Sequence, residues 1–75
     1  MIVWRKGGNY NAKRYEIMIS PGATHPDSTE FFDASGRPIQ FTIVFTYGKT
    51  EDLSSNLAQY LLDNGLAQET RIILA

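Results

Sequence analysis

With 75 residues and a net charge of −1, the chain is long enough for one small domain, which we expect to span residues 1–75. Apolar residues make up 43% of it and charged residues 20%, which is typical of a folded domain rather than a disordered chain. The absence of cysteine excludes disulfides and thiolate nucleophiles. No apolar run reaches the roughly 20 residues of a membrane span, and the N-terminal residues are not ordered as in a signal peptide, so we expect a cytoplasmic protein.

The first third of the chain predicts two strands and a loop. Residues 1–4 are short, apolar and β-prone, and a glycine-rich turn follows them. In residues 13–19 large apolar side chains occupy alternate positions, which is the period of a half-buried strand. Proline and small polar residues over 20–28 disfavour regular structure, so the longest loop is expected there.

Residues 27–33 support two interpretations. Asp27 followed by Glu30 has the spacing of a capping box, which would start a short helix that ends at Gly36. The interpretation we favour is a strand that forms a hairpin with the apolar segment after residue 38. Asp33 can brace the turn of such a hairpin, and Gly36 can adopt positive φ within it.

Residues 39–50 predict a strand and then a corner. Large apolar residues fall on every odd position from 39 to 47, which places them on one face of a strand. Gly48-Lys49-Thr50 has the ending of a phosphate-binding loop, but Ile43 stands where that pattern needs a glycine. We therefore interpret residues 48–50 as a plain turn from strand to helix.

A helix of about 12 residues is expected after this corner. Thr50 or Asp52 is expected to be its N-cap, and Gly65 is expected to end it in the left-handed conformation, with Leu66 closing a Schellman motif. Its apolar stripe consists of Leu53, Leu57, Tyr60 and Leu61.

Residues 71–74 form a continuous apolar run that predicts a final strand. The expected fold is therefore α+β, a mostly antiparallel sheet of four to five strands with one helix packed across a face. Exposed strand edges can pair with a neighbouring chain. The candidate edge-strand interface consists of Ile2, Val3, Arg71, Ile72, Ile73 and Leu74.

Charge is distributed unevenly along the chain. The first 15 residues carry four cations and no acid, whereas the remaining 60 carry three cations and eight acids. Aromatic residues are interleaved with these early cations, a mixture that can stack bases and neutralise phosphates. The alternative interpretation is that the aromatic residues belong to the core and the cations are simply solvated. The candidate contacts for nucleic acid or another anion are Trp4, Arg5, Lys6, Tyr10, Lys13 and Arg14.

Catalytic and metal-binding chemistry is not expected. His25 is the only histidine, so neither a histidine pair for a metal nor a conventional base beside a serine nucleophile can be recognised. So small a core can hardly also enclose a substrate pocket of several hundred Å³. We therefore expect a non-enzymatic protein without a metal, a cofactor or a small-molecule substrate.

Three motifs between Phe31 and Ala67 resemble small proteins encoded in the structural modules of tailed phages and prophages. They are the turn over residues 33–38, the strand end over residues 45–50, and the helix and stop over residues 57–67. The resemblance implies a virion or assembly component, such as a capsid decoration or head-tail accessory protein. The expected function is a protein-binding module, associated with a virion or cytoplasmic, whose partner is another protein or a second copy. The alternative is a small nucleic-acid-binding accessory protein.

Overall fold

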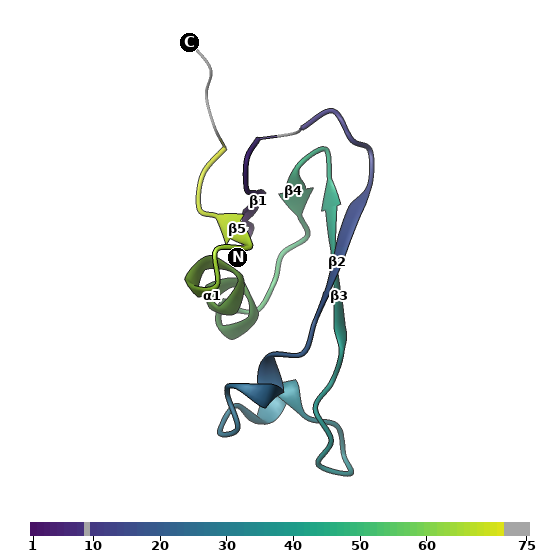
Figure 1. The fold of residues 1–75 in the computed structure, drawn as a ribbon, viewed down its shortest axis with the longest axis vertical. Coiled ribbons are helices and arrows are strands. Elements are labelled where there is room, and N and C mark those ends of the chain that lie inside the picture. Colours follow the sequence, from purple (N-terminus) through teal and green to yellow (C-terminus); the bar gives the residue numbers. More distant parts are fainter. Residues whose placement is uncertain (9, 72–75) are drawn as a thin grey trace.

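The computed structural model describes residues 1–8 and 10–71, which form an α+β fold with one antiparallel sheet (Figure 1). Its five strands lie in the order β2-β3-β4-β1-β5, and one helix follows β4 in the chain, so the expected fold class is confirmed. No helix in the described ranges is long and apolar enough to cross a membrane. The elements are β1 (Trp4–Arg5), β2 (Tyr15–Ile19), the 3₁₀ turns η1 (Pro21–Ala23) and η2 (Thr29–Phe31), β3 (Phe41–Thr46), β4 (Lys49–Thr50), α1 (Ser55–Asp63) and β5 (Ala67–Gln68).

Strands β2 and β3 form the longest ladder of the sheet. They pair antiparallel over five positions, from Tyr15 opposite Phe45 to Ile19 opposite Phe41. Ile43 and Phe45 are buried while their neighbours in the strand are more exposed, as the period-two pattern predicts. In Figure 1 this hairpin forms a long arm, with the two 3₁₀ turns at its lower end and α1 and β5 beside its upper part.

A tight hairpin, not a strand-to-helix turn, follows β3. Thr46 pairs with Lys49, so only Tyr47 and Gly48 lie in the connection. Their φ angles are 49° and 82°, and positive φ at both central residues is the signature of a type I′ turn. The predicted corner at residues 48–50 is therefore wrong, because Lys49 and Thr50 continue as strand β4 before the helix begins.

The helix is shorter than expected at its N-terminal end. It spans nine residues, and its N-cap is Ser54, whose Oγ accepts a hydrogen bond of 3.2 Å from the backbone N–H of Leu57. Thr50 cannot cap it, because its buried hydroxyl instead accepts from the N–H of Val3 at 3.1 Å. Asp52 is not the cap either, since it lies two residues before Ser54, outside regular structure, and its carboxylate pairs with the N-terminal amine of Met1.

The predicted C-terminal end of the helix is confirmed. Gly65 has a φ of 66°, and its N–H donates to the carbonyl of Leu62 at 3.2 Å. The N–H of Leu66 donates to the carbonyl of Leu61 at 2.9 Å. These two bonds are the pair that defines a Schellman motif, and they satisfy carbonyls that the helix leaves without an internal partner.

The favoured strand at residues 27–33 is wrong, whereas the turn after it is confirmed. The segment holds one 3₁₀ turn, with Ser28 rather than Asp27 at its N-cap, and only Phe32 makes a bridge, to Pro38. The Asp33 carboxylate braces the turn by accepting hydrogen bonds of 2.9 Å from the N–H groups of Ser35 and Arg37. The short-helix interpretation was therefore closer, although the capping box does not form.

The terminal strands are arranged differently from the prediction. β1 pairs with both β4 and β5, so Val3, directly before it, adjoins an interior strand and is fully buried. The predicted edge position of Val3 is therefore wrong, whereas Ile2 is 45% exposed and its part in an interface stays a prediction. The last strand within the described residues is β5, which begins four residues before the expected position because the chain pairs with β1 immediately after the helix stop. Arg71 lies beyond β5, and the predicted Ile72, Ile73 and Leu74 fall outside the described residues.

One hydrophobic core joins a face of the sheet to the helix. Leu57 and Leu61 of the predicted stripe are buried in it, while Leu53 and Tyr60 pack at its boundary. Because the helix covers this face, side chains that alternate to the opposite face are left available for other contacts. The buried core residues are Val3, Ile19, Phe31, Ile43, Phe45, Leu57, Ala58, Leu61 and Ala67.

Candidate functional site

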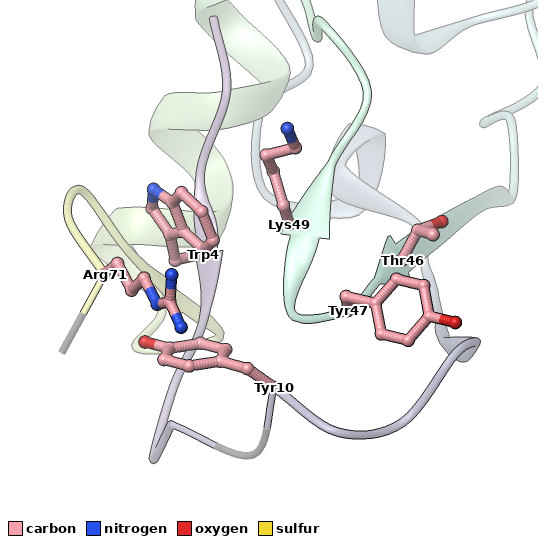
Figure 2. Close-up of a pocket in the computed structure, with 6 residues that line it drawn as sticks. All are labelled: Trp4, Tyr10, Thr46, Tyr47, Lys49 and Arg71. Atoms are coloured by element: carbon pink, nitrogen blue, oxygen red, sulfur yellow. The ribbon is translucent and has the colours of Figure 1, made fainter. Parts of the chain in front are cut away.

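A hollow of about 390 Å³ opens where β1, the β3–β4 hairpin and the segment after β5 meet (Figure 2). Three aromatic side chains, two cations and one hydroxyl surround it, and none of these six lining residues is acidic. We refer to it as the aromatic hollow. Its lining residues are Trp4, Tyr10, Thr46, Tyr47, Lys49 and Arg71.

The sheet register sets three of these residues in one row. Trp4 of β1 lies opposite Lys49 of β4, and Lys49 lies opposite Thr46 of β3. Val3, which precedes Trp4, is buried in the core, and successive residues of a strand point to opposite faces. The row of Trp4, Lys49 and Thr46 therefore lies on the face of the sheet that points away from the core.

Two tyrosines from loops complete the aromatic wall. The Tyr10 ring meets Trp4 edge to face, with centroids 5.7 Å apart and an interplanar angle of 73°. Tyr47 occupies the first central position of the hairpin turn and is 55% exposed. Figure 2 shows Tyr10 below Trp4, and Tyr47 on the other side of Lys49, with its ring directed toward the side of Thr46.

The cations of the hollow come from distant parts of the chain. The guanidinium carbon of Arg71 lies 5.2 Å from the centroid of the Tyr10 ring, which is a cation–π distance. Lys49 is exposed on β4. Since no carboxylate lines the hollow, both positive charges can attract an anion, while the aromatic faces can stack on a planar group.

The structure disperses most of the predicted basic cluster. Only Trp4 and Tyr10 of its six members line the hollow. Arg5 points to the opposite face, where its guanidinium carbon lies 3.6 Å from the centroid of the Tyr15 ring. Arg14 makes an exposed salt bridge of 2.9 Å with Glu16.

The two lysines of the predicted cluster also lie apart from the hollow. The Lys6 ammonium is beside Gly65, at the C-terminal end of α1, where the helix dipole favours a positive charge. Lys13 is exposed in the segment before β2 and does not line the hollow. The cations and aromatic residues that alternate in the first 15 residues therefore do not form one basic surface in the folded protein.

Four lining residues escaped the sequence analysis. Thr46, Tyr47 and Lys49 were assigned to a strand end and a plain corner, and Arg71 to a strand edge. The sequence did contain a signal for Thr46, Tyr47 and Lys49. Tyr-Gly between two β-prone runs fits a two-residue hairpin turn, and such a turn pairs Thr46 with Lys49 across the two strands. Nothing in the sequence pattern placed Arg71 near Tyr10.

A second candidate surface is the outer edge of β2. β2 pairs with β3 along one side, and within residues 1–8 and 10–71 no strand pairs with its other side. Met18 is 63% exposed on this strand, and the Arg14–Glu16 salt bridge lies at its start. Such an edge offers backbone donors and acceptors to another strand.

His25 packs against two aromatic rings, and within the part of the chain that the structure describes it has no arrangement typical of a catalytic histidine. Its Nδ1 lies 3.0 Å from the Thr24 hydroxyl, and its ring meets those of Phe31 and Tyr60 edge to face. Among the described residues, no three acidic, histidine or cysteine side chains lie close enough to share a metal ion. The expectation that the protein is not an enzyme stays a prediction.

No protein-family model matches the chain, and no curated protein or solved structure is significantly similar to it. The class that the fold defines is a small α+β domain with one antiparallel sheet and one helix. The expected place in a phage or prophage virion, the protein partner and the nucleic-acid contact therefore stay predictions.

Proposed function

We propose that this protein is a non-enzymatic protein-binding module, and that its partner at the outer edge of β2 is a second copy of the chain. The observation that carries the proposal is this five-residue strand, paired on one side only within the described ranges. Adding an antiparallel strand would satisfy its outward-facing backbone groups and extend the sheet, which is a common mode of protein recognition.

The charges at the edge favour a particular register. Two antiparallel copies that keep their cores on the same side of the sheet meet at a two-fold axis through one residue of the strand. An axis at Glu16 would set two carboxylates against each other. An axis at Tyr15 instead sets Arg14 of each copy opposite Glu16 of the other, which replaces the salt bridge within each chain by two between chains. In this register β2 of each copy pairs with residues 11–15 of the other, so the segment before β2 would extend the edge strand on dimerisation.

Met18 adds an apolar contribution to this interface. Among residues 1–8 and 10–71 it is the most exposed large hydrophobic residue, and it lies on the face of the edge strand opposite to Ile17 and Ile19. Burying such a side chain at a contact contributes about 25 cal/mol for each Å² removed from water. The edge therefore combines backbone pairing, opposite charges and apolar area.

We further propose that this module serves as a structural or assembly accessory of a phage or prophage virion. A protein that packs among identical neighbours benefits from a surface that pairs with itself. Mass spectrometry of purified particles from the source of the gene tests this proposal. The chain is expected at a stoichiometric level, and its absence from intact particles would overturn the virion role without affecting the β2 contact.

Sedimentation velocity over a concentration series tests the self-association. The wild type should shift reversibly from monomer to dimer, and Arg14→Glu and Glu16→Arg should each weaken the dimer by placing like charges opposite each other. The double variant Arg14→Glu/Glu16→Arg should restore it. Met18→Lys should weaken the dimer in every register. A wild-type chain that sediments as a monomer at all concentrations would overturn the proposed partner.

A further inference from the structure

We propose that the aromatic hollow is a binding site for single-stranded nucleic acid, with an unstacked base on the aromatic side chains and flanking phosphates on Lys49 and Arg71. This goes beyond the protein contact at β2, and it lies on different residues. The chain has eight acids and only seven basic residues, so a hollow lined by two cations and no acid is a local exception.

The turn residue Tyr47 gives an independent reason to assign a role to the hollow. A type I′ turn favours Asn or Gly at this position, because a residue with a larger side chain is strained at positive φ. Tyr47 has a φ of 49°, and its ring is more than half exposed, so core packing does not compensate for that strain. A strained residue that presents an aromatic ring at a hollow suggests function rather than stability.

The geometry suits a base better than a duplex. Trp4 and Tyr10 already hold each other edge to face at 5.7 Å, so they form a firm wall. Tyr47 also lines the hollow, on the other side of Lys49 as Figure 2 shows, so a planar group held at the Trp4–Tyr10 wall has a further aromatic side chain at the rim of the same hollow. Bases within a duplex are stacked on each other and cannot enter, whereas those of a single strand can.

The two cations are placed to hold the backbone of such a strand. Lys49 lies opposite Trp4 in the register of the sheet, and the guanidinium carbon of Arg71 lies 5.2 Å from the centroid of the Tyr10 ring, so both cations border the same hollow. Arginine and lysine bind phosphate oxygens through charge-assisted hydrogen bonds. An acidic protein segment would meet the same two charges, but it would not supply flat rings for three aromatic side chains.

Trp4 is the only tryptophan, so its fluorescence reports on the hollow directly. An oligothymidylate of about ten nucleotides is a suitable probe, because single-strand sites span roughly 4 to 16 nucleotides. Saturable quenching is expected, and two phosphate contacts predict a slope of about −1.4 for log K against log salt. A duplex of the same length and an oligoglutamate should quench much less.

Two variants and one matched control separate binding from folding. Tyr47→Asn should weaken oligothymidylate binding roughly 5- to 150-fold, the effect of losing one stacking ring, while it raises the denaturation midpoint because Asn is less strained in this turn. Lys49→Ala should reduce the magnitude of the salt slope by about 0.7, whereas Lys13→Ala removes the same charge outside the hollow and should leave the slope unchanged.

Three results would overturn the nucleic-acid site. The first is the absence of quenching even at low salt. The second is an equal effect of Lys49→Ala and Lys13→Ala, which would reduce the binding to nonspecific charge. The third is oligoglutamate binding as tightly as oligothymidylate, which would assign the hollow to an acidic protein segment. Tyr47 and Lys49 lie outside the β2 edge, so their variants do not bear on self-association, and Lys13→Ala serves only as the charge control for the salt slope.

Discussion

Tyr10 lies so close over Gly48 that the hairpin turn has no room for a side chain there. A Cβ atom built on Gly48 would overlap Cδ1 of the Tyr10 ring and lie 2.7 Å from its Cε1. Gly48 also has a φ of 82°. The glycine is therefore required twice, once for its backbone conformation and once because the wall of the aromatic hollow rests on it.

Gly48→Ala should consequently destabilise the protein more than a glycine change that introduces only backbone strain. Gly36→Ala is the matched control, because Gly36 has the same φ of 82° with nothing within 4 Å of the new methyl group. The control should cost about 1 kcal/mol, and Gly48→Ala about 1–3 kcal/mol more because Tyr10 must move. Urea denaturation of both variants measures the difference, and equal losses would show that Tyr10 does not rest on the turn.

Leu61→Ala should be among the most damaging single truncations. Leu61 is fully buried at the centre of the helix face, so its removal loses apolar burial and leaves a cavity. A loss of about 2–5 kcal/mol is expected in chemical denaturation. Met18→Ala, at an exposed position, is the control and should change the monomer by less than about 0.5 kcal/mol. A small effect at Leu61 would mean that the helix packs through another face.

The strongly periodic parts of this fold were predictable, and the short paired segments were not. β3 and the buried face of α1 follow from apolar spacing alone, because many side chains share one direction. β4 has only two residues and no period of its own, and it exists because Thr50 and Lys49 pair with β1, more than 40 residues earlier. This long-range pairing adds to the local pairing of Lys49 and Thr50 with β3, and together they keep both residues in the sheet and out of the helix.

Ser54→Ala tests the corrected start of the helix. The Ser54 hydroxyl accepts the N–H of Leu57, and its loss leaves that donor without its partner in the cap. A destabilisation of about 1 kcal/mol is expected, while Ser55→Ala, one residue into the helix, makes the same chemical change outside the cap and should cost less. No loss of stability in Ser54→Ala would show that the Ser54 hydroxyl does not cap the helix.

The candidate site shows why charge and aromatic content along a sequence are weak guides to a surface. Trp4 and Arg5 are adjacent in the chain, yet strand alternation sends them to opposite faces, Arg5 to Tyr15 and Trp4 to the hollow. Applying that alternation to residues 3–5 would have separated them in advance. The approach of Arg71 to Tyr10 depends on where β5 leads the chain, which local sequence does not encode.

The Asp33 turn should make part of the stability depend on pH. The backbone N–H of Arg37, followed by the Ser35 hydroxyl, holds the pKa of the Asp33 carboxyl below its ordinary value of 3.8. A carboxyl whose pKa is lower in the folded than in the unfolded protein contributes stability above its unfolded pKa. It loses that contribution as the pH falls through the folded pKa. The wild type should therefore lose stability below about pH 4 relative to Asp33→Asn, which cannot titrate.

Nuclear magnetic resonance titration of the Asp33 carboxyl carbon checks the cause directly. In the wild type the midpoint should lie below 3.8, and in Ser35→Ala it should move upward, because the variant removes the hydroxyl that donates to Oδ1 at 2.7 Å. The bonds from the N–H groups of Ser35 and Arg37 remain in that variant, so the shift should be partial. An unchanged midpoint in Ser35→Ala would assign the lowered pKa to the backbone donors alone, and a wild-type midpoint at or above 3.8 would contradict the turn geometry.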